Sequence, residues 1–454
     1  MQSPNDSRPA TPDPTWRAPV AAGPLAGDVA LPGSKSLTNR ELVLAALADG
    51  PSTIHLPLHS RDSELMVGAL RALGVGIDPV DGSGSYGPDL RITPGAIGAA
   101  AGAVTIDCGL AGTVMRFLPP LAALATGRVT VDGDPQARRR PMRTTIESLV
   151  ALGVQVTDDG GGAMPFGFVG TGHVRGGEIA IDASASSQFV SGLLLSAPRF
   201  DEGLVLRHTG ATLPSMPHIA MTVDALRARG VVVDEPERGV WHVHPGPIGA
   251  RDVVIEPDLS NAAPFAVAAL VAGGTVRIRT WPERTTQVGA DLQALLPRWG
   301  ATVVRDGADL VVDGGVGVRG GASLPGVDLD LSRGGELTPA LVALAALAAG
   351  PSTITGIGHL RGHETDRLAA LVDDLTGLGG AVTELDDGLR IEPRPLHGGA
   401  WRAFEDHRMA HAGAVIGLVV DGVEVDDIGS TAKTLPQFPE LWAALVATAA
   451  TGPS

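Results

Sequence analysis

The sequence contains very little lysine. Of its 34 basic residues only two, Lys35 and Lys433, are lysine, and all the others are arginine. Arginine therefore serves almost everywhere that this chain carries a positive charge. An ammonium group is compact and can give up a proton, whereas a guanidinium is planar and permanently charged. We therefore treat both lysines as candidates for chemistry.

Cysteine, long apolar runs and an excess of positive charge are also lacking. The one cysteine, Cys108, excludes an internal disulfide framework and favours a reducing compartment. No apolar run approaches the roughly 18 residues that a membrane span needs. The formal net charge of −16 argues against a nucleic acid or an anionic membrane as partner, because the protein would repel phosphate. An anionic ligand therefore needs a local basic pocket.

The length of 454 residues favours two or three domains. A hydrophobic content of 44% and a charged content of 19% are typical of a soluble globular protein. Residues 1–17 contain several prolines and have neither an apolar h-region nor the acid-poor, arginine-rich character of a transit peptide. We therefore expect a disordered tail over residues 1–17 and a cytoplasmic enzyme.

The sequence repeats itself. Residues 45–54, AALADGPSTI, recur at 345–354 as AALAAGPSTI, and looser copies of this helix, turn and strand occur at 121–131, 268–278 and 414–425. A second repeated element is a helix that ends in glycine and is followed by a short β-branched strand. Its copies lie at 66–77, 145–156, 222–233, 292–303 and 371–382. The pattern predicts about six units, three in each half.

The hydropathy of these units predicts an unusual layering. The helices in LVLAALADG, LVALAALAAG and AAPFAVAALVAGG are apolar nearly all round, which is typical of helices surrounded by protein. The strands in RVTVDG, TVRIRT and VEVDDIG alternate apolar with polar residues, so each sheet should have one face in water. We therefore expect an α/β (α+β) protein with helices buried and sheets outside.

Residues 31–40, LPGSKSLTNR, predict an anion site. A glycine turn leads into a helix N-terminus, where backbone N–H groups favour negative charge. Ser36 and Arg40 lie four residues apart and share a helix face beside Lys35. The stretch alone is weak, because its lysine does not directly follow a glycine as a nucleotide P-loop requires.

Further stretches carry polar groups suited to chemistry, and some allow a structural interpretation as well. The hydroxyls of Ser184–Gln188 suit the oxygens of a polar ligand but also suit a helix N-cap. The arginines 138 and 139 are equally compatible with a solvated face. The other stretches are 107–116, 133–141, Glu336, 363–367, 406–409 and 431–434.

No metal site is expected. His363-Glu364 begins like a zinc-protease helix, but Arg367 stands at the second histidine position. His407 and His411 have ligand spacing without an identifiable third ligand. His242 and His244 are interpreted as parts of a strand.

Taken together, LPGSKSLTNR, GLAGTVMRF, SSQFVSGLL, HETDR, DHRMA and TAKT resemble the EPSP synthase (3-phosphoshikimate 1-carboxyvinyltransferase) family from residue 30 to the end. The resemblance implies two inside-out domains, each of three βαβαββ units, joined by two crossings. One domain would span residues 34–252, and the other would join 1–33 to 253–454. The active site would lie in the cleft between them, and the protein would be a monomer.

The resemblance also implies the reaction. The 5-hydroxyl of shikimate 3-phosphate attacks C2 of phosphoenolpyruvate, the methylene group is protonated, and phosphate leaves the tetrahedral intermediate without a cofactor. The catalytic residues would be Lys35, Glu336 as base, and Glu364 or Lys35 as acid. Shikimate 3-phosphate would be bound by Lys35, Ser36, Arg40, Ser186, Ser187, Gln188, Ser215, Glu336, His359 and His363. Phosphoenolpyruvate would be bound by Lys35, Gly112, Arg140, Gln188, Arg367, Arg408 and Lys433.

This chain departs from the family pattern at several positions. The family commonly has asparagine at Leu110 and aspartate at Glu336. Tyrosine, asparagine and lysine commonly stand at His218, His359 and His363, and proline at Phe117. Two rival functions remain: the enolpyruvyl transferase that uses UDP-N-acetylglucosamine, and a catalytically idle scaffold. The first is disfavoured because that family has Lys-Asn where Lys35-Ser36 stands and a reactive cysteine on a mobile loop. The second is disfavoured because the chain retains both lysines, Glu336 and Glu364.

Overall fold

The computed structural model describes residues 15–82 and 84–451. Its α-helices are α1 (Lys35–Ala46), α2 (Arg61–Ala72), α3 (Gly112–Ala122), α4 (Arg143–Ala151), α5 (Gln188–Ser196), α6 (Met216–Ala228), α7 (Ala263–Ala272), α8 (Leu292–Leu295), α9 (Thr338–Ala346), α10 (Arg367–Gly377), α11 (His407–Gly417) and α12 (Phe438–Ala447). Short 3₁₀ helices are η1 (Ala137–Arg139), η2 (Ala197–Arg199), η3 (Val288–Asp291), η4 (Leu296–Trp299), η5 (Gly335–Leu337), η6 (Gly358–Gly362), η7 (Ile428–Lys433) and η8 (Thr448–Thr451).

The strands form six small sheets. The first sheet contains, in order, β14 (Val253–Val254), β3 (Ser52–His55), β5 (Asp89–Thr93) and β4 (Gly76–Val80). The second contains β6 (Gly98–Asp107), β7 (Thr126–Asp132), β9 (Phe166–Thr171) and β8 (Val156–Thr157). The third contains β10 (Gly177–Ile181), β11 (Leu204–His208), β13 (Val240–Val243) and β12 (Val233–Glu237). The fourth contains β2 (Leu25–Val29), β15 (Gly274–Ile278), β17 (Asp309–Asp313) and β16 (Thr302–Asp306). The fifth contains β18 (Asp328–Asp330), β19 (Ser352–Thr355), β21 (Gly388–Glu392) and β20 (Ala381–Leu385). The sixth has three strands, β22 (Gly399–Trp401), β23 (Val423–Val425) and β1 (Trp16–Arg17).

The five four-stranded sheets share one topology, which confirms the repeats predicted from the sequence. In each, the first two strands named above are parallel and the remaining pairs are antiparallel. Residues 45–54 and 345–354 fall at equivalent places, the end of α1 with β3 and the end of α9 with β19. Each unit is therefore a βαβαββ element, or a shortened one in the three-stranded sheet.

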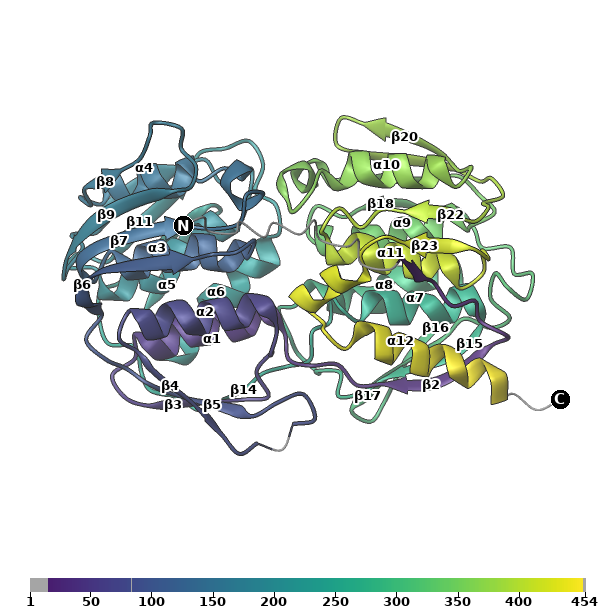
Figure 1. Ribbon diagram of the computed structural model, residues 1–454, viewed down its shortest axis with the longest axis horizontal. Coiled ribbons are helices and arrows are strands. Elements are labelled where there is room, and N and C mark those ends of the chain that lie inside the picture. Colours follow the sequence, from purple (N-terminus) through teal and green to yellow (C-terminus); the bar gives the residue numbers. More distant parts are fainter. Residues whose placement is uncertain (1–14, 83, 452–454) are drawn as a thin grey trace, which may run out of the picture.

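The helices lie inside and the sheets outside, as the hydropathy predicted. Figure 1 shows two halves side by side, with α1 to α6 in one and α7 to α12 in the other. All residues of α7 and α9 are buried, while β7 alternates buried with more exposed residues towards its end. One core cluster runs from Leu42 to Ile255, and the other combines Ala18–Leu31 with Leu259–Ala449. Each half therefore buries its own apolar core.

The chain crosses between the halves twice, and the two crossings lie side by side. β2 lies just before the first crossing and pairs with β15 of the second half. β14 lies just before the second crossing and pairs with β3 of the first half. The backbone N–H of Ser34 donates to Glu256 O at 2.8 Å, and that of Asp258 donates to Pro32 O at 2.9 Å. At the second crossing, β14 still pairs with β3, and Ile255 still belongs to the core of the first half.

Residues 15–17 of the predicted disordered tail belong to the described part of the chain, and two of them form a strand. Trp16 and Arg17 form β1 and pair with Val425 and Glu424 of β23. Trp16 packs against the core of the second half, which explains why this end is ordered. Residues 1–14 of the predicted tail lie outside the described residues. Among the described helices, none combines the length and apolar character needed to cross a membrane.

Candidate active site

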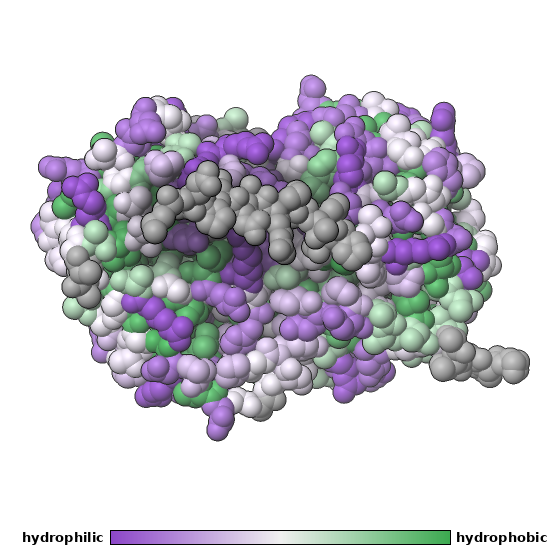
Figure 2. Space-filling view, in the orientation of Figure 1, coloured by the Kyte–Doolittle hydropathy of each residue, from purple (hydrophilic) through white to green (hydrophobic). Residues whose placement is uncertain are grey.

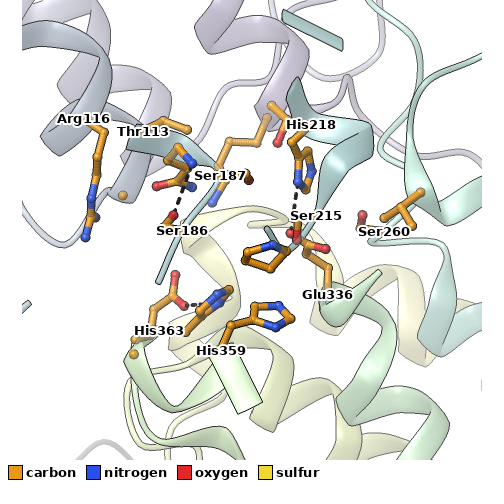
Figure 3. A pocket seen from close by; sticks show the side chains of 18 of the residues that line it. Thr113, Arg116, Ser186, Ser187, Ser215, His218, Ser260, Glu336, His359 and His363 are labelled. Carbon is orange, nitrogen blue, oxygen red and sulfur yellow. Dashed lines mark hydrogen bonds and ion pairs between the residues drawn. The ribbon is translucent and has the colours of Figure 1, made fainter. Parts of the chain in front are cut away.

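A cavity of about 300 Å³ lies where the two halves meet, and almost all the predicted site residues line it. Figure 3 shows serines from the first half facing Glu336 and two histidines from the second, and Figure 2 shows hydrophilic residues around the junction. From the first half come Lys35, Ser36, Arg40, Gly112, Arg140, Ser186, Ser187, Gln188 and Ser215. From the second come Glu336, His359, His363, Glu364, Arg367 and Arg408. Lys433 is not among the lining residues but contacts one of them, because its Nζ donates to Glu364.

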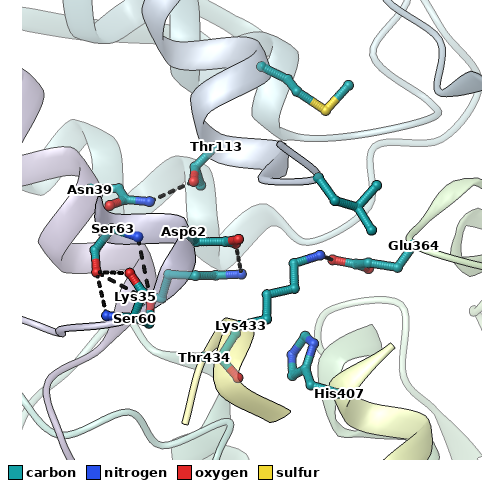
Figure 4. Close-up of polar contacts among 12 residues, drawn as sticks. Lys35, Asn39, Ser60, Asp62, Ser63, Thr113, Glu364, His407, Lys433 and Thr434 are labelled. Carbon is teal, nitrogen blue, oxygen red and sulfur yellow. Dashed lines mark hydrogen bonds and ion pairs between the residues drawn. The ribbon is translucent and has the colours of Figure 1, made fainter. Parts of the chain in front are cut away.

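Lys35 is held at the start of α1 by two carboxylates. Its backbone N–H donates to Asp258 Oδ2 at 3.1 Å, which satisfies a free amide at the helix N-terminus. Its Nζ donates to Asp62 Oδ2 at 3.1 Å, and the Asp62 side chain is only 2% exposed. Asp62 comes from α2, so two helices fix the direction of the ammonium group. Figure 4 shows Lys35 beside Asp62 and Lys433 beside Glu364.

Arg40 is buried one turn further along α1. Its guanidinium donates to Ser36 O at 2.8 Å, His218 O at 2.9 Å and Thr222 Oγ1 at 2.7 Å, and it lies 5.1 Å from the centre of the Phe117 ring. Burial lowers the pKa of Arg40 to about 9, against the opposing charge of Glu336. The group remains cationic at neutral pH, so Arg40 supplies a fixed positive charge at the wall of the cavity.

Two further arginines meet at the start of α3. Arg140 donates to Leu110 O at 3.1 Å, while the Nε atoms of Arg116 and Arg140 are buried with no partner among the described residues. Burial, and then the charge of Arg140, lower the pKa of Arg116. Gly112 leaves room for these groups, because a Cβ there would lie 2.9 Å from Gln188 Oε1 and 3.3 Å from an Arg140 nitrogen. The arrangement suits an anion with several oxygens.

The serines gather at the starts of two helices of the first half. Ser186 Oγ accepts from the backbone N–H of Gln188 at 3.2 Å, and Ser187 precedes α5 without capping it through its side chain. Ser215 precedes α6 in the left-handed region at φ 54°, and its N–H donates to Ser332 O of the second half at 3.1 Å. The alternative interpretation of these serines as a side-chain N-cap is therefore not met on α5, whereas both Ser186 and Ser187 line the cavity.

Glu336 projects from η5 beside the first half. Its Oε1 lies 3.5 Å from His218 Nδ1, and its buried Oε2 has no partner among the described residues. Burial favours the neutral carboxyl, but His218 and the Arg408 guanidinium outweigh it and lower the pKa of Glu336 to about 2. The carboxylate is therefore ionised at neutral pH and has one oxygen free to accept a proton or a hydrogen bond from a ligand.

Glu364 joins two cations of the second half. Its Oε1 accepts from Lys433 Nζ at 2.6 Å, and its Oε2 accepts from Arg367 at 3.0 Å. Arg367 in turn donates twice to Asp406, at 2.7 and 3.1 Å. Burial opposes ionisation of Glu364, but Lys433 and Arg367 lower its pKa well below the ordinary value. Glu364 therefore holds no proton at neutral pH in this arrangement.

Three histidines of the second half are neutral at neutral pH. Burial lowers the pKa of His359, His363 and His407, and Arg367 adds to the effect at His363. His359 lies close against η5, because a Cβ on Gly335 would meet its Nε2 at 2.6 Å. His359 Nε2 has no hydrogen-bond partner among the described residues, so a neutral ring nitrogen is available to a ligand.

Several lining or supporting residues were not assigned from the sequence. Arg116 lines the cavity and stands within the GLAGTVMRF stretch. Its position in that motif could have identified it as a site residue. Asp62 and Asp258 reach Lys35 across 27 and 223 residues, and no local spacing announces such contacts. His407 follows the Asp406 N-cap of α11 and lines the cavity. The buried Cys108 lies outside this lining, and burial raises its pKa to about 12.

Comparison with known proteins now decides the family. The family described as EPSP synthase (3-phosphoshikimate 1-carboxyvinyltransferase) matches residues 20–442. A 3-phosphoshikimate 1-carboxyvinyltransferase of Kocuria rhizophila is 57% identical over 437 residues, which are 96% of this chain and 97% of that relative. The chain belongs to the EPSP synthase family. The membership confirms the resemblance found in the sequence motifs.

Solved structures agree with this membership. An EPSP synthase from Acinetobacter baumannii superposes with a TM-score of 0.76 at 25% identity, over 95% of this chain and 97% of that one. The enolpyruvyl transferase NikO from Streptomyces tendae has a TM-score of 0.72 at 20% identity, over 94% of this chain and 96% of that one, and supports the fold alone. The predicted α/β architecture of an EPSP synthase is confirmed.

Proposed function

We infer that this chain transfers the enolpyruvyl group of phosphoenolpyruvate to the 5-hydroxyl of shikimate 3-phosphate, in the shikimate pathway to aromatic amino acids. The observation that carries this inference is one cavity between the halves, lined by fixed cations from both and by an ionised carboxylate with a free oxygen. Two anionic substrates need such a set of cations, because the chain as a whole carries a net charge of −16. The reaction uses no cofactor.

We propose that shikimate 3-phosphate binds mainly to the first half. Its phosphate would lie among the serine hydroxyls and Arg40, since hydroxyls and a guanidinium suit phosphate oxygens. Its ring hydroxyls would face Glu336 and the neutral histidines across the cavity. The full proposed set is Lys35, Ser36, Arg40, Ser186, Ser187, Gln188, Ser215, Glu336, His359 and His363.

We propose that phosphoenolpyruvate binds between the two arginine groups. Arg116 and Arg140 offer unpartnered nitrogens on one side, and Arg367 and Arg408 lie on the other. A bound anion would relieve the mutual repulsion of these cations. Gly112 would let the ligand approach the start of α3. The set carried from the resemblance is Lys35, Gly112, Arg140, Gln188, Arg367, Arg408 and Lys433, to which the cavity adds Arg116.

We propose that Glu336 accepts the proton of the attacking hydroxyl, because it is ionised and one oxygen is free. Of the two candidates for protonating the methylene carbon, Lys35 is favoured over Glu364. Glu364 accepts hydrogen bonds from two cations, and its depressed pKa leaves it without a proton to donate. In this scheme Glu364 orients Lys433 and Arg367.

The domain division is also proposed. The two cores and the paired crossings support one domain over residues 34–255 and another that joins the N-terminal segment up to 33 with residues 256–454. The cleft between these domains would hold both substrates. A monomeric state and a cytoplasmic location stay predictions, and the first is tested by light scattering of the purified protein.

Phosphate release distinguishes the proposed reaction from its rivals. Purified protein is given phosphoenolpyruvate with shikimate 3-phosphate, with UDP-N-acetylglucosamine, or with no acceptor. We expect release only with shikimate 3-phosphate. Release with the nucleotide sugar would favour the other transferase. That family has a reactive cysteine on a mobile loop, whereas the Cys108 thiol of this chain is buried and burial raises its pKa. No release with either acceptor would favour an idle scaffold.

A further inference from the structure

Apart from the active-site cavity, a second group of polar side chains lies together on the surface of one sheet. Asp234, His242 and His244 stand on the sheet of β10, β11, β13 and β12, and each offers a ligand atom within 4.8 Å of the others. None of the three lines the active-site cavity. Trp241 and Val243, which alternate with the histidines, are buried, so the three side chains occupy the outer face of the sheet.

The strand register brings these residues together. Asp234 of β12 is the cross-strand partner of His242 of β13, and directly opposed residues share a face. His244 follows His242 by two residues and therefore lies on the same face. The ladder continues past the end of β13, because the N–H of His244 donates to Val232 O at 3.0 Å. The backbone therefore fixes all three Cα positions.

The side chains already converge. His244 Nε2 lies 2.7 Å from Asp234 Oδ2, and the two imidazole rings have their centres 3.8 Å apart at an angle of 32°. The ring of His242 makes no hydrogen bond to any residue that the structure describes, which leaves its ring nitrogens available.

The charged neighbours leave this group accessible to a cation. Two nearby positive groups are already paired: the Arg227 guanidinium pairs with Glu235 at 3.1 Å and donates to Val233 O at 2.7 Å, and Arg207 pairs with Glu178 and Glu237. The side chains of Asp234 and His244 are 61% and 39% exposed, so they can turn towards an ion. Each metal bond would be about 2.0–2.2 Å long, and small rotations of exposed side chains bring the ligand atoms to that reach.

We propose that Asp234, His242 and His244 form a binding site for one divalent transition-metal ion of the class that prefers imidazole, such as Zn²⁺, Co²⁺ or Ni²⁺. Two imidazoles and one carboxylate suit these ions, whereas Mg²⁺ and Ca²⁺ prefer oxygen ligands throughout. Water would complete the coordination. Because β12 is an edge strand, the ion would tie it to β13 and stabilise the folded chain.

The test uses full-length protein freed of its purification tag and stripped of metal. Zn²⁺ binding is measured by calorimetry, Co²⁺ binding by its visible spectrum, and stability by thermal melting with Zn²⁺ or with a chelator. We expect one ion per chain and a higher Tm with Zn²⁺. His244→Ala should weaken binding at least about tenfold, since even loss of an outer partner costs on the order of ten- to a hundredfold. Asp234→Asn should weaken it as well.

His173→Ala is the matched control. His173 is an exposed histidine that pairs with Asp201 at 3.1 Å, and it belongs to no three-residue cluster among the described residues. This variant should bind Zn²⁺ as the unaltered protein does. Melting in the chelator shows whether each variant is folded. The proposal is overturned if the unaltered protein takes up no ion, or if His244→Ala and Asp234→Asn bind as tightly as His173→Ala.

Discussion

At the scale of single residues, each of the two lysines is paired with a buried carboxylate. Lys35 donates to Asp62, and Lys433 donates to Glu364. Each pair holds a compact cation in a fixed direction, and the side chains of Lys35 and Lys433 are only 18% and 8% exposed. A guanidinium is larger and planar, so it would not fit the same space in the same orientation. This geometry gives a physical reason why these two positions carry lysine in a chain that otherwise uses arginine.

We therefore predict that Lys35→Arg keeps the fold and loses most turnover. The larger group would displace phosphoenolpyruvate, and a misplacement of about 1 Å can cost on the order of a hundredfold in rate. It also could not give a proton to the methylene carbon. The measurement is kcat at saturating substrates, with circular dichroism as the control for folding. Lys433→Arg should chiefly raise the KM for phosphoenolpyruvate. A kcat of Lys35→Arg near the unaltered value would refute the argument from lysine scarcity.

At this scale the sequence predicted the charged groups better than their partners. Lys35, Arg140 and Arg367 were found because they stand in short motifs. Asp62 was not found, because it lies 27 residues from Lys35 on an ordinary amphipathic helix and only the packing of α2 against α1 brings them together. The protonation states were also beyond the sequence. The low pKa of Glu336 depends on burial and on charges from distant segments.

At the scale of elements, the start of α3 shows how a glycine shapes the site. A Cβ at Gly112 would lie 2.9 Å from Gln188 Oε1 and 3.3 Å from an Arg140 nitrogen, so these two ligand-facing side chains would have to shift. Gly112→Ala should raise the KM for phosphoenolpyruvate about tenfold, because such overpacking costs about 1–3 kcal/mol. Gly68→Ala in α2 is the control, since a Cβ there meets nothing within 4 Å. Equal KM values in the two variants would show that α3 does not approach the ligand.

Asp374 in α10 makes stability depend on pH. Burial raises its pKa from 3.8 to about 7, although Arg402 donates to it at 3.3 Å. Between these two values the folded chain holds a proton that the unfolded chain has lost, so stability falls as pH rises. Asp374→Asn removes this dependence. The Tm of Asp374→Asn minus the Tm of the unaltered protein should therefore increase as the pH is raised from 4 to about 7. Asp373→Asn, an exposed neighbour, should show no such trend, and parallel curves for both variants would contradict the assignment.

Elements were predicted well where the signal was local. The repeated helix, glycine and strand patterns marked the units, and all-apolar helices indicated that helices lie inside. The short 3₁₀ helices η5 and η6, which carry Glu336 and His359, had no periodic signal and were not predicted. Pairing of β2 with β15 spans about 250 residues of chain, and only the family resemblance anticipated such crossings. Tertiary contacts, rather than local patterns, decide these features.

At the scale of the whole molecule, the site belongs to both halves. Gln136 donates to Glu405 across the junction, and Ser215 donates to Ser332. Closely spaced cations from both halves repel one another until anions bind between them. We therefore expect the domains to separate without substrates and to close on them. Small-angle scattering should show compaction when shikimate 3-phosphate and an unreactive phosphoenolpyruvate analogue are added together. An unchanged radius of gyration would contradict closure.

The central claim is enolpyruvyl transfer in the cavity between the halves, and proton NMR of the reaction in D₂O tests it most directly. Transfer forms a new enol ether whose vinyl protons are partly replaced by deuterium, because the methylene carbon takes up a solvent proton before phosphate leaves. We expect these signals with the unaltered protein and their loss with Lys35→Arg. Pyruvate in place of an enol ether would show hydrolysis, and an enol ether without deuterium would contradict protonation of the methylene group.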